Sequence, residues 1–492
     1  LSDSSRSANT MTNIFKTVIT KYLEATARRV IKREHPRIVG ITGSVGKTST
    51  KEAIACVLGA TERVGKSQKS YNSEIGLPFA ILELTSPYRS VVGWIRVLLV
   101  SALRAVHTPS YPRTLVLEMG VDKPRDMDLL LHIVRPHIAV MTAIGDTPVH
   151  MERFQNAAAL VREKAKIFSK QGHEDWAILN YDDDVVRALT QAAKGKVLTY
   201  GFHKDADIRA SEYKLLYTHE SATMPEGITF KVEYKGSAVP VRLYGALGRQ
   251  QVYNALAAAA VGIARGMNLI AISEALRNYE SQPGRLRVID GIKGSHILDD
   301  TYNASPLAVH AALDTLGDIK KGRAICVLGD MLELGAASET AHREIGKHVS
   351  EVCDNLFIVG PHSYFIADEA IKFMPAARII EAPDAITAGH AVQEMVDEGD
   401  IVLVKGSQGI RMERAVEEIM AHPEERAHVL VRQEDVWKEA EERGNARFLQ
   451  QLFGSAIVLG GVVITPITWP IAVVIVSLGV WIYRNASRPY IA

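Results

Sequence analysis

Apolar and polar positions follow two alternating patterns along most of the chain. From residue 36 onward, short β-branched runs such as "RIVGIT", "TLVLEMG" and "IAVMTAIG" alternate with stretches that repeat with helical spacing. A second series follows, with "AICVLGD", "NLFIVG", "ARIIEA" and "DIVLVKGS", and it fades near His422. Strands that alternate with helices form parallel sheets covered by helices. The pattern therefore predicts the α/β class, with two sheets in succession.

A helix-breaking pair separates the two series. In "LRNYESQPGRLRVIDGI", Pro283 and Gly284 directly follow Gln282 and precede a new strand. We predict a phosphate-loop domain with a mostly parallel sheet and then a smaller Rossmann-like α/β domain, between an amphipathic leading helix and a hydrophobic helical tail. The predicted segments are 1–35, 36–282, 283–430 and 431–492.

Two further segments have apolar residues at helical spacing. Residues 11–35 end in Lys and Arg, which predicts a packed leading helix and leaves a membrane-surface helix as the alternative. Residues 91–106, "VVGWIRVLLVSALRAV", include Arg96 and Arg104. Because these charges recur at helical spacing, an amphipathic or buried helix is expected there rather than a membrane span.

The tail contains a long apolar run. No charged residue lies between Leu452 and Tyr483, and Pro466 and Pro470 interrupt the run. One straight helix would be about 48 Å long, against a hydrocarbon core of about 30 Å, whereas each of two arms would be only about 20 Å. A membrane-dipping hairpin and one tilted, kinked span both stay open, ahead of a core helix. Arginines at both ends favour the hairpin. They are Arg443, Arg447, Arg484 and Arg488.

Composition narrows the choice of partners and compartment. The 492 residues predict two or three domains, and 57 Lys plus Arg against 56 Asp plus Glu give no global reason to expect a nucleic acid partner. Cys56, Cys326 and Cys353 are widely spaced and form no C-x-x-C pair. Neither a disulfide framework nor a zinc site is therefore expected, and a reducing cytosol fits best.

The stretch "RIVGITGSVGKTSTKE" has the features of a phosphate-binding loop. A strand that ends in glycines lets backbone N–H groups converge on phosphate oxygens, and the helix that follows adds the positive end of its dipole. Lys47 supplies a point charge, and the Thr48 hydroxyl can hold Mg²⁺. The strict spacing G-x-x-x-x-G-K-[ST] would need a glycine where this chain has Ile41. A plain strand-to-helix turn is the alternative, and nucleotide binding is favoured.

"GITGSVGKTSTKE" resembles the loop of the Mur ligases, ATP-dependent amide-forming enzymes of cell-wall assembly. Further stretches resemble that family in the same order: "YNSEIGLPFAIL", "LVLEMG", "TAIGDTPVHMERF", "REKAKIF", "YNALAAAAV", "PGRLRV", "DDTYNASP", "LGDMLELG" and "LVKGS". The pair "DDTYNASP" and "LGDMLELG" is most similar to the branch that adds D-alanyl-D-alanine. The resemblance extends over roughly residues 36 to 420.

The resemblance implies how the reacting groups are held. ATP would phosphorylate a carboxylate, and an amine would displace the phosphate. Thr48 and Glu118 would ligate one Mg²⁺, and His150 with a carbamylated Lys164 would ligate a second; a surface helix is the alternative for Lys164. Arg285 would reach back to the phosphates when the second domain closes. The residues expected to bind the phosphates are Gly43, Ser44, Val45, Gly46, Lys47, Thr48 and Ser49.

The resemblance also implies contacts to the rest of the nucleotide and to the substrates. Asn254 would contact adenine, although Gln250 and Gln251 replace the usual His-Asn, and Lys166 stands where the family has an acidic residue. The cleft between the domains would be lined on the nucleotide side by Asp300, Tyr302 and Asn303. The acyl acceptor would contact Asn72 and Glu74, and the incoming amine would face Lys405 and Ser407.

These features together predict a monomeric ligase that joins a cell-wall peptide carboxylate to a D-alanyl-D-alanine-like dipeptide. The family's UDP-sugar-binding domain precedes the loop, and Met11 to Pro36 is too short for it, so altered recognition of the nucleotide sugar is expected. With the tail, this predicts an enzyme in the cytoplasm at the inner membrane face. A ligase of another branch, such as a polyglutamate or folylpolyglutamate synthase, and a P-loop ATPase or scaffold that makes no amide bond are the alternatives.

Overall fold

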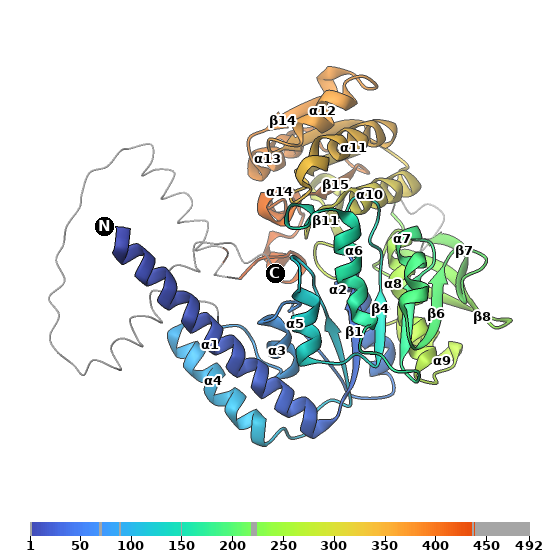
Figure 1. The fold of residues 1–492 in the computed structure, drawn as a ribbon. Helices are drawn as coiled ribbons and strands as arrows, with labels where there is room; N and C mark the ends of the chain where they lie inside the picture. Colours follow the sequence, from blue (N-terminus) through green and yellow to red (C-terminus); the bar gives the residue numbers. More distant parts are fainter. Residues whose placement is uncertain are drawn as a thin grey trace.

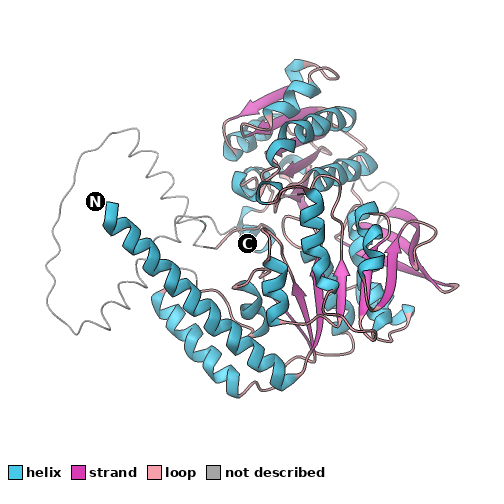
Figure 2. Ribbon diagram, in the orientation of Figure 1, coloured by secondary structure: helices cyan, strands magenta, loops and turns pink. Residues whose placement is uncertain are grey.

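The computed structural model describes residues 2–67, 71–87, 90–148, 150–217, 224–434 and 437 of the chain. Within these residues the chain forms two β-sheets, one after the other in sequence, with helices packed against both (Figures 1 and 2). The α/β prediction is therefore confirmed. The predicted tail lies outside the described residues.

The described part of the first sheet has nine strands in the order β2-β3-β1-β4-β5-β6-β7-β8-β9. The strands from β2 to β7 in that order run parallel, and β8 and β9 extend the sheet antiparallel. The strands are β1 (Arg37–Thr42), β2 (Val64–Lys66), β3 (Thr114–Glu118), β4 (Ile138–Met141), β5 (Trp176–Asn180), β6 (Lys196–Gly201), β7 (Ile208–Leu216), β8 (Gly227–Tyr234) and β9 (Ser237–Tyr244).

Helices cover this sheet because its parallel strands are apolar throughout. Every residue of β3 and β4 is buried, which is the pattern of strands covered on both faces. The helices of this part are α1 (Ser2–Glu34), α2 (Lys47–Gly59), α3 (Gly76–Ile81), α4 (Val91–Val106), α5 (Asp126–Ile133), α6 (Ala157–Ala165), α7 (Asp184–Arg187), α8 (Arg249–Ala264) and α9 (Leu269–Leu276).

The second sheet has six strands among the described residues, in the order β10-β11-β15-β12-β13-β14. Only β10 is antiparallel to its neighbour. Its strands are β10 (Arg287–Asp290), β11 (His296–Asp300), β12 (Ala324–Gly329), β13 (Asn355–Val359), β14 (Ile379–Ala382) and β15 (Ile401–Lys405). Its helices are α10 (Pro306–Ile319), α11 (Ser338–Val352), α12 (Tyr364–Ala370), α13 (Ala385–Met395), α14 (Glu413–Ile419) and α15 (Arg426–Val429).

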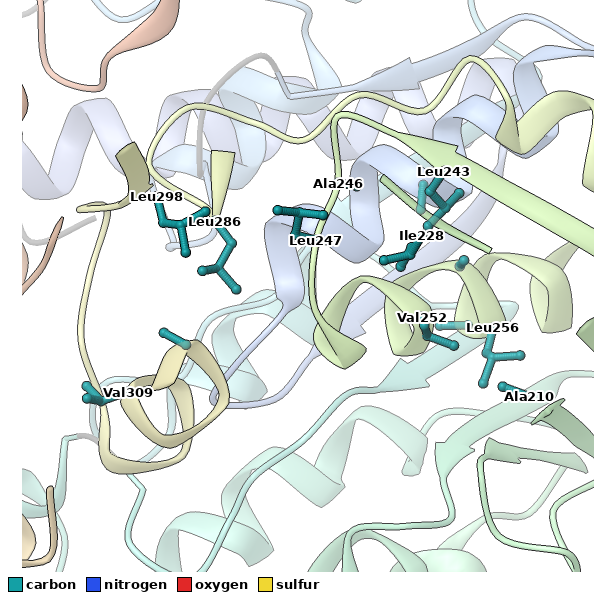
Figure 3. Close-up of a cluster of buried hydrophobic side chains, with 14 of the residues drawn as sticks. Ala210, Ile228, Leu243, Ala246, Leu247, Val252, Leu256, Leu286, Leu298 and Val309 are labelled. Atoms are coloured by element: carbon teal, nitrogen blue, oxygen red, sulfur yellow. The ribbon is translucent and has the colours of Figure 1, made fainter. Parts of the chain in front are cut away.

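The two units share a continuous apolar core. One cluster of buried residues includes Leu247 and Val252 from the first unit and Leu286, Leu298 and Val309 from the second (Figure 3). Gly248 has φ of 85°, and a Cβ built there would lie 2.3 Å from Thr315 Oγ1 of α10. A glycine is thus required where the start of α8 meets the second unit.

Every strand quoted from the sequence as a β-branched run forms a strand, and the predicted boundary at Gln282 lies between α9 and β10. The sequence pattern did not predict that the first sheet ends in the antiparallel strands β7, β8 and β9. Residues on the two faces of these strands alternate between buried and accessible, unlike the continuous apolar runs of the parallel strands.

Helices α1 and α4 lie side by side at one edge of the molecule (Figure 1). Leu23, Ala27 and Val30 of α1 are fully buried, as expected for a packed leading helix. Tyr22 Oη donates to Leu98 O at 3.0 Å, and an Arg33 guanidinium nitrogen donates to Ala105 O at 2.7 Å, so the two helices run in the same direction. No helix in the described ranges is both long enough and apolar enough to span a bilayer.

Candidate active site

The phosphate loop connects β1 to α2 at the carboxyl end of the parallel strands. Gly43 has φ of 145° and Gly46 has φ of 85°, and a Cβ on Gly43 would fall 1.9 Å from Thr142 Oγ1. The amides of Ser44 and Val45 donate to Ala143 O at 2.7 and 3.2 Å. These contacts fix the loop against the end of β4. Helix α2 begins at Lys47, so its first-turn N–H groups and positive dipole end face the loop.

Two lysines converge on one carbonyl oxygen of this loop. Lys47 Nζ donates to Gly43 O at 2.9 Å, and Lys164 Nζ, from α6, donates to the same oxygen at 3.0 Å. The Lys164 side chain is 1% exposed, so the surface-helix interpretation of "REKAK" is wrong for this residue. Burial, and then the charge of Lys47, lower the pKa of Lys164 to about 7, while burial lowers the pKa of Lys47. Two amines thus crowd one carbonyl oxygen, and a polyanion bound at the loop would favour their charged forms.

Thr48 and Glu118 lie together at the start of α2 and the end of β3. Thr48 Oγ1 donates to Glu118 Oε2 at 3.2 Å, and the other oxygen of Glu118 is 3.2 Å from the buried Lys51 Nζ. Arg285, from the start of the second unit, donates to Thr48 Oγ1 at 2.8 Å. Its guanidinium also lies 4.0 Å from the centroid of the Tyr302 ring. Arg285 thus reaches across to the loop, and its contact with the phosphates stays a prediction.

A hydroxyl and a carboxylate at this spacing are oxygen donors of the kind that Mg²⁺ prefers, so the pair Thr48 and Glu118 fits one such ion. In the structure the Arg285 guanidinium donates to the same hydroxyl, and Lys51 compensates the charge of Glu118. The described residues contain no set of three or more His, Cys, Asp or Glu side chains arranged to hold a metal. The four-residue ligand set that includes His150 and Lys164 stays a prediction.

His150 connects the two units. Its Nε2 is 3.3 Å from Asp122 Oδ1, and its Nδ1 is 2.8 Å from Oε2 of Glu333, in the second unit. The hydrogen bond to His150 lowers the pKa of Glu333. Sequence reasoning missed both carboxylates, although Glu333 lies within the quoted motif "LGDMLELG" and Asp122 directly follows "LVLEMGV".

Asn254 lies beneath the phosphate loop in a buried network of side-chain amides. Its Oδ1 accepts from Thr50 Oγ1 at 3.0 Å, and its Nδ2 donates to Gln251 Oε1 at 3.0 Å. Gln251 Nε2 in turn donates to Arg285 O at 3.3 Å. The network joins α2 and α8 to the segment that carries Arg285. These contacts give Asn254 a role in supporting the loop, and its contact with adenine stays a prediction.

The predicted residues of the second unit surround the end of β15. Lys405 Nζ donates to Asp300 Oδ2 at 2.5 Å and to Asn303 O at 2.9 Å, and Ser407 Oγ accepts from Leu332 N at 2.8 Å. Sequence reasoning missed Arg432, whose buried guanidinium contacts the carbonyls of Thr301 and Tyr302. These side chains thus lie around the segment "DDTYNASP", whose Tyr302 ring contacts Arg285.

Asn72 and Glu74 lie on the loop before α3. Gly120 N donates to Asn72 O at 2.8 Å, and a Cβ on Gly120 would lie within 2.9 Å of the Asn72 amide. The close approach places Asn72 beside the end of β3, which carries Glu118. The loop therefore borders the phosphate site, on the side where the acyl acceptor is expected.

A phosphate loop contacted by an arginine of a second α/β unit, with a glutamate of that unit on the nearby His150, is the arrangement of an ATP-dependent enzyme that works in a cleft between two domains. Residues 41–262 match the Mur ligase middle domain, and residues 284–408 match the Mur ligase glutamate ligase domain. The chain belongs to the Mur ligase family.

Individual relatives agree with this assignment. The UDP-N-acetylmuramoyl-tripeptide--D-alanyl-D-alanine ligase of Bacillus subtilis is 29% identical over 403 residues, which cover 82% of this chain and 79% of that one. The crystal structure of the MurF ligase from Thermotoga maritima in complex with ADP has a TM-score of 0.68 at 26% identity and covers 83% of this chain and 84% of its own. A MurF structure from Acinetobacter baumannii, at 24% identity, has the same fold, with a TM-score of 0.66 and coverage of 80% and 79%.

Proposed function

We propose that this protein uses ATP to activate a peptide carboxylate as an acyl phosphate and joins it to the amine of a D-alanyl-D-alanine-like dipeptide. The observation that supports this most directly is the convergence of Lys47 and Lys164 on Gly43 O, at a loop reached by Arg285 from the second domain. The name of the relative from Bacillus subtilis supplies the substrate class, and the structure from Thermotoga maritima is a complex with ADP.

The residues at the loop suit the first chemical step. The carboxylate oxygen attacks the γ-phosphorus of ATP, and ADP leaves. Lys47 and the first turn of α2 hold the phosphate oxygens and offset the charge on the transferring phosphoryl group. Arg285 would move from the Thr48 hydroxyl to the phosphates as the second domain closes and excludes water.

In the second step the amine nitrogen attacks the acyl carbon, inorganic phosphate leaves, and the nitrogen loses a proton. The incoming amine would approach from the second unit, near Lys405 and Ser407, and the acyl acceptor from the side of Asn72 and Glu74. The His150–Glu333 contact joins the two sides of the cleft. Closure of the cleft would therefore bring the two substrates together.

Mg²⁺ would bind between Thr48 and Glu118 and would neutralise charge on the phosphates. For a second ion, CO₂ would add to the amine of Lys164 to form a carbamate, which turns a cation into an anionic oxygen ligand. The pKa of Lys164 is lowered to about 7, so a large share of this amine is uncharged and nucleophilic near neutral pH.

We further propose that the acceptor is presented at the inner face of the cytoplasmic membrane, where the apolar run from Leu452 to Tyr483 would anchor the chain. Two other functions remain to be separated by experiment: a ligase of the polyglutamate or folylpolyglutamate branch, and a P-loop ATPase or scaffold.

The test is phosphate release by the full chain with ATP and Mg²⁺, with product mass as the second readout. D-Ala-D-Ala is compared with single amino acids, each with UDP-linked and lipid-linked muropeptide. Release that needs both the dipeptide and a muropeptide supports the proposal. Stimulation of phosphate release by glutamate instead would assign the enzyme to the polyglutamate branch. Release that no acceptor stimulates would identify an ATPase and overturn the proposal.

A further inference from the structure

The outward face of α4 is apolar. Its exposed residues include Val92 (77% exposed), Ile95 (51%), Leu99 (62%), Leu103 (69%) and Val106 (72%), spaced three or four residues apart. Among the α4 positions whose side chains the structure describes, Arg96 is the one charged residue with high exposure. A surface helix of a soluble protein normally turns polar residues toward water, so this face requires an explanation.

The opposite face of α4 is firmly packed. Trp94 and Val97 are 4% and 6% exposed, and Ser101 is fully buried. Ser101 Oγ donates to Tyr22 Oη of α1 at 3.4 Å, and the Phe79 and Trp94 rings meet edge to face with centroids 5.9 Å apart. Because these contacts fix the rotation of the helix, the leucines cannot turn inward. The apolar face is held toward the outside.

The neighbouring helix adds positive charge. The exposed positions of α1 with described side chains include Lys21, Arg28, Arg29 and Lys32, and no acidic residue. The acidic residues of α1 with described side chains are Glu24, which pairs with Lys21 and His132, and Glu34, which pairs with Arg33. The α1–α4 pair therefore combines an apolar stripe with exposed cations, the composition of helices that lie in the interface of an anionic bilayer.

We propose that the α1–α4 pair docks on the surface of an anionic lipid bilayer, with Leu99 and Leu103 of α4 inserted among the acyl chains. This surface is separate from the ligase reaction proposed above, and it can be tested without it.

Other occupants fit less well. The stripe from Val92 to Val106 is about 21 Å long, and the exposed cations lie on the neighbouring helix α1, so an anionic surface complements the charge of the pair. The exposed cations of α1 would also repel those of a second copy. The uncharged run from Leu452 to Tyr483 has far more apolar surface than this stripe could cover, and a bilayer accommodates both.

The first experiment measures partition of the full chain into vesicles rich in phosphatidylglycerol. Because the apolar run from Leu452 to Tyr483 would itself bind vesicles, every chain compared carries Val473→Glu/Val476→Glu in that run. On this background Leu99→Glu/Leu103→Glu should lower the partition coefficient at least tenfold. The matched control is Ile270→Glu/Phe373→Glu, at positions that are 62% and 57% exposed on other parts of the surface, and it should change binding less than twofold. Because all four positions are exposed, circular dichroism should be unchanged. Equal binding by the background chain and the α4 variant would overturn the proposal.

The second experiment identifies the occupant directly. An environment-sensitive fluorophore on Leu99→Cys should shift to the blue when anionic vesicles are added, and much less with phosphatidylcholine vesicles. A blue-shifted emission without vesicles, at all protein concentrations, would mean that another segment of the chain covers α4. A shift that develops with protein concentration would mean a second copy. Either result would overturn the proposal.

The cationic part of the surface has its own test. Arg29→Gln/Lys32→Gln should lower binding to anionic vesicles severalfold and reduce its salt dependence, with little change for neutral vesicles. Binding that is unaffected by both the substitution and salt would contradict a role for these charges.

Discussion

The phosphate loop and helix α4 depart from the usual distribution of residues in opposite ways. The loop buries charge, since Glu118 and Lys164 are each 1% exposed, whereas α4 exposes Leu99 and Leu103. Isolated charges cost several kcal/mol to bury, and an exposed leucine forgoes about 1.5–3 kcal/mol of burial. Glu118 is neutralised within the chain by Lys51. Among the described residues, Lys164 Nζ donates to a carbonyl that it shares with Lys47, and the charge of Asp122 only partly offsets its burial. Leu99 and Leu103 lie in water, so both regions have a cost that a ligand would relieve.

The largest effect is expected from removing the charge at the loop. Lys47→Met should lower the rate of ATP-dependent ligation by at least about 10²- to 10³-fold, because one electrostatic contact to the transferring group is lost. Phosphate release at saturating ATP measures it. The exposed Lys204→Met is the matched control and should stay near the wild-type rate. A Lys47→Met rate within tenfold of wild type would contradict the role of the loop.

The free energy cost of burying the Lys164 charge can be measured from the pH dependence of the free energy of unfolding. Its pKa is about 7 in the folded chain and about 10.4 unfolded, so between these values the unfolded chain binds the extra proton. The free energy of unfolding therefore rises with pH across this window. In CO₂-free buffer, Lys164→Met should be more stable than wild type by about 3–4 kcal/mol near pH 6, and the gap should narrow toward pH 10. Urea unfolding at several pH values measures it.

The control for this prediction is Lys51→Met. Lys51 is as deeply buried as Lys164, but it lies 3.1 Å from Glu52 and 3.2 Å from Glu118. Removing it leaves a buried carboxylate without its partner, so this variant should be less stable than wild type. If Lys164→Met were the less stable of the two variants at pH 6, the hypothesis that the buried Lys164 charge destabilises the chain in the absence of a ligand would be wrong.

Local signals explain why much of this molecule could be predicted from its sequence. Glycines and Lys47 after an apolar strand define the phosphate loop within a dozen residues, and β-branched runs between helices define the parallel strands. Helix α4 was expected from the spacing of Arg96 and Arg104. In each case the deciding residues lie close together along the chain.

Contacts between distant segments could not be predicted. His150 meets Glu333 across the domain interface, and Arg432 reaches back to Thr301, and neither pair has a spacing that marks it in sequence. The direction in which α4 faces also depends on which side packs against α1, since both sides of the helix are apolar. Asn254 was assigned a base contact by resemblance, and its contacts with Thr50 and Gln251 became visible only in three dimensions.

The smallest effect on folding is expected at α4, and it completes the comparison. Leu99→Gln should change the free energy of unfolding by less than about 0.5 kcal/mol, because the side chain is 62% exposed and little burial is lost. Val97→Ala, two residues away on the packed face of the same helix and 6% exposed, should cost about 1–2 kcal/mol. Urea unfolding of the full chain without lipid measures both. A loss above about 1 kcal/mol for Leu99→Gln would mean that part of the chain already covers this face, and the contrast between the two regions would disappear.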